Sequence, residues 1–160
     1  MLCPALLAAF LAACAQGEPP VRPAFYADLA KPGAALDPVT SGQILNSYRT
    51  GKGLAPLSAD GKLEAIAQAE AVRLSGLGEI TPGRDAALDA ALKAAGYTPA
   101  RVKRSVTGGY HSFADAFSGW RGAPHHNGVL LAPKGRSYGL AAYAAPGSRH
   151  RVYWVMLVAE

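Results

Sequence analysis

A stripe of apolar residues at helical spacing marks the clearest element of the chain, a helix over about residues 59–75. Its members lie three or four positions apart, which places them on one face of a helix: Leu63, Ile66, Ala67, Ala71 and Leu74. Ser58 is expected to cap the first turn, and Gly76 and Gly78 are expected to end the helix.

Three further helices are predicted from capping residues that precede apolar positions. Asp37, Asp85 and Ser112 stand before the segments 38–50, 86–95 and 113–121. In the last of these segments, four residues are expected to face inward: Phe113, Ala116, Phe117 and Trp120.

Strand patterns dominate the carboxyl-terminal part. Residues 102–107 alternate, and the segments 138–144 and 150–159 flank the turn Pro146-Gly147-Ser148, which is typical of a hairpin. In the last strand one face carries Val152, Trp154, Met156 and Val158, and the other carries Tyr153, Val155 and Leu157. Because both faces are apolar, both must be covered by other elements. The pattern therefore predicts an α/β fold, a three-layer α/β/α sandwich with a central, mainly antiparallel sheet.

The first residues resemble an export signal rather than part of the fold. Leu6 to Ala13 are uncharged and apolar, too few to span a bilayer but typical of a signal peptide. The run Leu11-Ala12-Ala13-Cys14 resembles a lipobox, in which the cysteine receives a diacylglycerol anchor to the membrane. The predicted organisation is a signal peptide over 1–13, a tether and leader over 14–36, and one domain over 37–160.

A second cleavage site would give a different product. Ala13-Cys14-Ala15 also fits an A-x-A-like site, which would release a soluble protein. On the lipoprotein route, Ala15 in place of Asp favours an exported envelope lipoprotein on the outer membrane, facing the periplasm. Cys3 leaves with the signal peptide, so a lipidated Cys14 leaves the domain without a disulfide.

Composition narrows the class of partner. Half of the 160 residues are hydrophobic, 17% are charged, and the net charge is +5, which favours anionic surfaces. Arg101, Lys103 and Arg104 form the only tight basic group, and no aromatic ladder accompanies it. Nucleic-acid binding is therefore not expected.

Five segments resemble, in order, the CAP superfamily of cysteine-rich secretory, antigen 5 and pathogenesis-related-1 proteins, including its bacterial SCP-like members. They are Asn46-Ser47-Tyr48-Arg49 with Gly53-Leu54-Ala55-Pro56-Leu57, the helix Leu63 to Ala71, Ala95-Gly96-Tyr97, Ser112 to Trp120 with Ala123-Pro124-His125-His126, and Tyr153-Trp154-Val155. The resemblance covers about residues 38–160 and implies an α/β/α sandwich, in agreement with the hydrophobic pattern.

The resemblance also implies a cleft with two histidines and two acidic residues, which sometimes holds a divalent metal. His126 matches one of those histidines, but Arg104 stands where the family has a glutamate, and no histidine lies before residue 111. One imidazole beside a cation cannot gather a divalent metal. We therefore expect neither a metal nor another cofactor.

The remaining cleft candidates are Glu70, Arg104, His125 and Trp120. Glu70 lies on the apolar stripe of its helix, where a carboxylate needs a partner. Two partners are open: Arg73 at the i+3 position, or Arg104 in a buried pair that replaces the family's lost one. His125 adjoins His126, and Trp120 is also a core candidate.

Two functions follow from these patterns. The first is an exported, membrane-anchored and non-catalytic domain that binds a protein partner or an apolar ligand, such as a lipid, at the cell envelope. The second is an envelope hydrolase or peptidase-like enzyme that uses His126 with a non-standard partner. A carboxylate within reach of His126 would favour the second.

Overall fold

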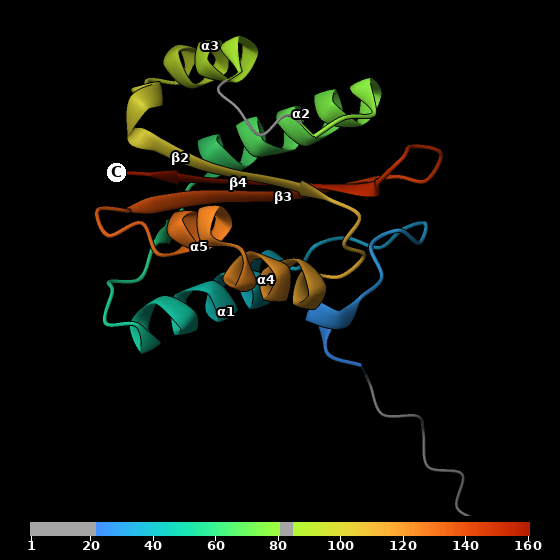
Figure 1. Cartoon of the computed structure of the whole chain (residues 1–160), viewed down its shortest axis with the longest axis horizontal. Helices are drawn as coiled ribbons and strands as arrows, with labels where there is room; N and C mark the ends of the chain where they lie inside the picture. The colour runs from blue at the N-terminus through green and yellow to red at the C-terminus, as the bar shows by residue number, and fades with distance from the viewer. Residues whose placement is uncertain (1–21, 81–84) are drawn as a thin grey trace, which may run out of the picture.

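Two layers of helices enclose a four-stranded sheet (Figure 1). The computed structural model describes residues 22–80 and 85–160; the predicted signal peptide and Cys14 lie outside the described residues. The sheet order is β1 (Ser58–Ala59), β3 (Ser137–Ala145), β4 (Arg151–Ala159) and β2 (Val102–Gly108). β1 runs parallel to β3, and the other neighbours are antiparallel. The α/β/α sandwich is confirmed, with a mixed sheet.

The two layers contain different helices. α2 (Gly61–Leu77) and α3 (Ala86–Ala94) cover one face of the sheet, while α1 (Pro38–Gly51), α4 (Phe113–Gly122) and α5 (Pro124–Leu130) cover the other (Figure 1). Short 3-10 turns lie at Ala24–Tyr26 and Pro99–Arg101.

β4 supplies the centre of both cores, as its apolar faces predict. Val152, Trp154, Met156 and Val158 pack with the α1, α4 and α5 layer, and Tyr153, Val155 and Leu157 pack with the α2 and α3 layer. All seven side chains are fully buried. A strand buried on both faces has to lie inside a sandwich.

Capping residues set the helix starts. Asp37, Asp85 and Ser112 accept hydrogen bonds from backbone N–H groups of the first turns of α1, α3 and α4, as predicted. The prediction for α2 was wrong: Ser58 belongs to β1, and Asp60 caps the helix instead, accepting from the N–H groups of Lys62 and Leu63. The parallel pairing of Ser58 with Ser137 is a tertiary contact that local sequence does not signal.

Gly139 allows α2 to lie directly on the sheet. A Cβ at this position of β3 would collide with the backbone of Leu63 and Glu64 in the first turn of α2. Only glycine permits so close an approach of helix and strand.

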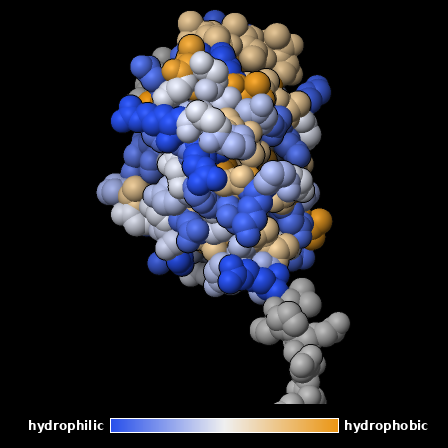
Figure 2. All heavy atoms as spheres, turned by 90° about the vertical axis from the view of Figure 1, so that its right-hand side faces the viewer, coloured by the Kyte–Doolittle hydropathy of each residue, from blue (hydrophilic) through white to orange (hydrophobic). Residues whose placement is uncertain are grey.

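The face of the molecule shown in Figure 2 is mostly hydrophilic. Figure 2 shows polar residues over most of one face, and hydrophobic colour gathers at its top, at the level of α3 in Figure 1, where exposed alanines lie. Across residues 22–80 and 85–160, no helix is long and apolar enough to cross a bilayer.

Candidate functional site

α5 brings His125 and His126 to the outer edge of the sheet. Pro124 occupies the first position of this helix, which runs to Leu130. His125 is exposed and His126 half-buried. Their ring centroids lie 5.3 Å apart, and the rings are nearly perpendicular.

His126 is bound to a serine of β2. The Ser105 hydroxyl and His126 Nδ1 are hydrogen-bonded at 2.8 Å, and Ser105 is only 1% exposed. Burial lowers the pKa of His126, and the neighbouring His125 lowers it further. The ring therefore favours its neutral form near neutral pH, oriented by a hydroxyl rather than by a carboxylate.

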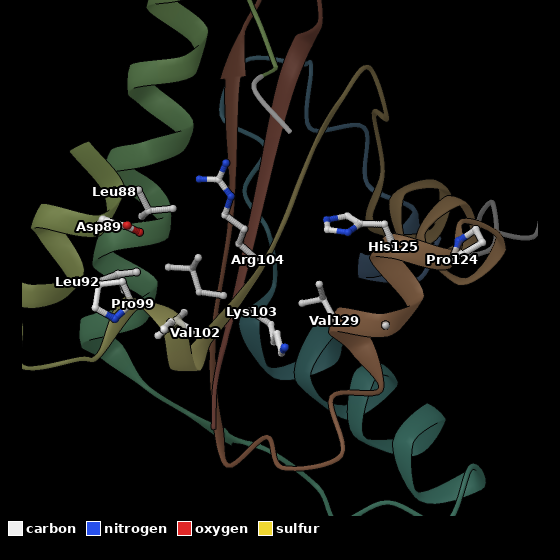
Figure 3. Close-up of a pocket in the computed structure, with 13 residues that line it drawn as sticks. Leu88, Asp89, Leu92, Pro99, Val102, Lys103, Arg104, Pro124, His125 and Val129 are labelled. Carbon is white, nitrogen blue, oxygen red and sulfur yellow. The ribbon is translucent and has the colours of Figure 1, made fainter. Parts of the chain in front are cut away.

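Arg104 lies on the other face of β2 from His126. Side chains alternate along a strand, so Ser105 and Thr107 face the α4 and α5 layer, while Arg104 lies on the same face as Val106, which packs in the α2 and α3 layer. Figure 3 shows the Arg104 side chain leaving β2 in the direction opposite to Lys103. The residue that meets the histidine is thus Ser105, which the sequence analysis did not single out.

A cavity of about 520 Å³ straddles β2 beside these residues. Its walls come from α3, with Leu88, Asp89 and Leu92, and from α5, with His125 and Val129 (Figure 3). Lys103 and Arg104 lie between the walls, and the apolar side chains of Val102 and Leu157 complete the lining. We call this cavity the β2 groove. A second hollow of about 490 Å³ borders Val106 to Gly108 and shares His125.

Glu70 is paired within its own helix layer. Arg73 donates to both carboxylate oxygens, at 2.8 and 2.9 Å, and also binds Asp85, the cap of α3. Glu70 is 5% exposed. Of the two partners that the sequence analysis considered for Glu70, the structure shows Arg73 at the i+3 position. Because Arg73 also binds Asp85, the ion pair links α2 to the start of α3.

Trp120 is a core residue and not a cleft residue. It is fully buried, and its ring meets that of Trp154 edge-on at a centroid distance of 5.9 Å. Its Nε1 donates to Thr107 Oγ1 at 2.9 Å. A tryptophan packed in this way cannot contact a bound ligand, which corrects its assignment to the cleft.

The described residues contain no cluster that fits a metal. Within 22–80 and 85–160, no three His, Cys, Asp or Glu side chains lie together closely enough to hold an ion. His126 offers one ring nitrogen beyond its bond to Ser105, and a divalent metal needs several converging ligands.

The sequence analysis did not identify two buried polar residues that hold neighbouring elements together. Arg49 is fully buried and donates to the carbonyls of Ala55, Leu130 and Ala132. Its position four residues after Leu45, on the apolar side of α1, was the available signal. Ser105 could have been found from strand parity, because it lies between two residues that face the other layer.

The comparisons with known proteins agree with this architecture. A protein-family model described as CAP, cysteine-rich secretory protein family, matches residues 43–158. No curated protein gives a significant sequence match.

Solved structures of three bacterial proteins share the fold. A cysteine-rich secretory protein of Staphylococcus aureus subsp. aureus Mu50 has a TM-score of 0.61 at 18% identity over 76% of this chain and 38% of that one. An extracellular protein containing an SCP domain from Bacillus anthracis str. Ames gives 0.64 at 14% identity, over 76% of this chain and 40% of that one. An outer surface protein of Borrelia burgdorferi has a TM-score of 0.63 at 16% identity, over 79% of this chain and 96% of that one. The chain thus spans about two fifths of the first two proteins and nearly all of the third.

Proposed function

The chain belongs to the CAP, or cysteine-rich secretory protein, family, and from this membership and the lipobox-like run that ends at Cys14 we propose that it is an exported, lipid-anchored protein of the cell envelope that binds a partner or an apolar ligand without catalysis. The observation that carries the binding role is the β2 groove. Its volume of about 520 Å³ and its apolar lining suit a ligand.

The surroundings of His126 support a non-catalytic role. The hydrogen bond that orients the ring comes from Ser105, whereas a general base is usually held by a carboxylate. Among the described residues, no carboxylate forms a hydrogen bond or an ion pair with this ring. The residues around His126 therefore fit a wall of a binding site better than a catalytic centre.

The alternative, a hydrolase that uses His126, draws support from one contact. Ser105 Oγ and His126 Nδ1 have the separation of a nucleophile and its base. A serine that is 1% exposed, however, cannot meet a substrate without a rearrangement of the groove. Equal hydrolysis of envelope peptides by wild type and His126→Ala would exclude this alternative.

Ligand binding is tested with anilinonaphthalene sulfonate, an apolar dye with one negative charge. We expect saturable dye fluorescence with the full chain, and its loss in Gly128→Trp. Gly128 is exposed on α5, lines the groove, and has open space where a side chain would go. The matched control is Gly51→Trp, at an exposed and equally open position of α1. Equal dye binding by both variants and wild type would contradict a ligand site in the groove.

Export and anchoring are tested at Cys14. In a double-membrane bacterial host, the chain with its own amino-terminal segment should incorporate labelled palmitate and fractionate with the outer membrane. Cys14→Ala should abolish the label, and Cys3→Ala should not. Labelling that persists in Cys14→Ala would reject the anchor, and release of an unlabelled soluble protein would support cleavage after Ala15, at the A-x-A-like site.

A further inference from the structure

β2 presents one edge of its backbone away from the sheet. Among the described residues, β2 pairs with β4 on one side only. The N–H of Glu160 donates to the carbonyl of Arg101 at 2.9 Å, and that of Gly109 donates to the carbonyl of Val152 at 3.0 Å. Hydrogen-bonded pairs alternate along an antiparallel ladder, so the backbone groups of Val102 and Val106 point outward.

The β2 groove follows this outward edge. One wall is α3, the other is α5, and Lys103 and Arg104 lie between them (Figure 3). The second hollow continues along residues 106–108 and shares His125. Together the two hollows border both ends of β2 and lie on both of its faces. This is the geometry in which an added strand places alternate side chains into two rows of pockets.

The charged residues that line the β2 groove indicate which kind of peptide segment binds there. Lys103 and Arg104 line the groove, Arg101 immediately precedes β2, and Asp89 is the one carboxylate among the described lining residues. Lysine on an edge strand also discourages pairing with further copies of the same chain. A partner with carboxylates opposite Lys103 would overcome that barrier, because complementary charge governs which partner binds.

We propose that β2 binds an extended, acidic peptide segment of a partner protein by strand addition, with apolar side chains in the groove. This inference rests on the proposed binding function and specifies the partner at the same site. The peptide's backbone pairs with the outward edge of Val102 to Gly108. Its carboxylates lie on the α5 side of β2, where Lys103 is, and its alternate apolar residues lie on the α3 side, against Leu88 and Leu92.

The test uses a capped octapeptide that alternates Glu and Val, titrated calorimetrically into the full chain. A second peptide of the same sequence carries a methyl group on every second amide nitrogen, which removes the donors of one edge but keeps the charge. We expect binding by the first peptide and at least about tenfold weaker binding by the methylated one, since main-chain hydrogen bonds supply the affinity in strand addition.

Two charge variants complete the experiment. Lys103→Glu should weaken binding by about tenfold or more, and Lys31→Glu, an exposed lysine in the loop after the first 3-10 turn, should leave it within about twofold. Circular dichroism verifies that both variants fold. Strand addition is overturned by a peptide that does not bind, by equal binding of the methylated peptide, or by equal binding of Lys103→Glu.

The dye titration separates this inference from the proposed function. If the dye binds in the groove and the peptide does not bind, strand addition is rejected and the proposed binding function stands. Dye binding that Gly128→Trp leaves unchanged would reject the groove as a ligand site, whatever the peptide does.

Discussion

Replacing Arg49 with methionine should destabilise the protein severely, although Arg49 does not line the β2 groove. Its guanidinium is fully buried and makes three hydrogen bonds, from Nε to Ala55 O at 2.9 Å, from Nη1 to Leu130 O at 2.7 Å and from Nη2 to Ala132 O at 3.2 Å. These contacts join α1 to the loop that follows it and to the end of α5. Burial lowers the pKa of Arg49, but an arginine remains charged throughout the usual pH range.

The size of the loss follows from the acceptors left behind. Methionine keeps the apolar stem but leaves three buried carbonyls without these donors, and each such loss costs about 1–3 kcal/mol. Removing a buried charge regains part of its desolvation cost, so the net loss is about 3 kcal/mol. For a protein of this size that lowers Tm by about 6–12 °C.

Thermal unfolding followed by circular dichroism measures this effect. Arg49→Lys keeps the charge but only a compact ammonium group, so its Tm should fall between those of wild type and Arg49→Met. Arg149→Met, at an exposed position in the β3–β4 hairpin, is the matched control and should leave Tm unchanged. A Tm for Arg49→Met within about 2 °C of wild type would refute the reasoning, because about 3 kcal/mol cannot be lost with so small a shift.

Three further outcomes are expected. Tyr97→Phe removes a hydrogen bond from the Tyr97 hydroxyl to Asp60 Oδ2 of 2.5 Å and should cost about 1 kcal/mol in a urea titration. Burial and that bond raise the pKa of Tyr97 to about 12. The contribution of Tyr97 to the free energy of unfolding is therefore complete below pH 10.0 and is lost as pH rises through about 12. This pH dependence should be absent in Tyr97→Phe. Tyr153→Phe deletes a buried hydroxyl without a hydrogen-bond partner among the described residues, so its Tm should equal or exceed that of wild type. Because the pKa of His126 is lowered, its NMR titration midpoint should lie below 6.5, and its contribution to stability, complete above 6.5, should decline as pH falls through that midpoint.

The apolar pattern was sufficient to predict the layers of the fold. β4 is hydrophobic on both faces, and its alternate residues from Val152 to Val158 enter the two predicted cores. The capping residues of α1, α3 and α4 could also be predicted, because Asp and Ser side chains accept hydrogen bonds from the first backbone N–H groups of a helix, which have no partner within the helix. These features depend on local chemistry and on burial, which a single sequence records.

Other features depend on contacts between distant segments. β1 has only two residues, and its pairing with β3 has no periodic signature. α5 combines adjacent histidines with Gly128 over seven residues, so its amphipathic pattern is too short to distinguish from a loop. To predict the contact between Ser105 and His126, one needs to know both which face of β2 Ser105 lies on and where α5 lies. The position of α5 could not be predicted from the sequence.

The motifs by which the chain resembles its family act largely on its backbone. Asn46 donates to the carbonyl of Leu57 at 2.9 Å and accepts from its N–H at 2.8 Å. Arg49 binds three backbone carbonyls. Backbone groups are present whatever the side chains are, so these contacts can persist while the residues around His126 change. Family membership in this chain therefore argues strongly for the fold, whereas its activity has to be argued from the β2 groove itself.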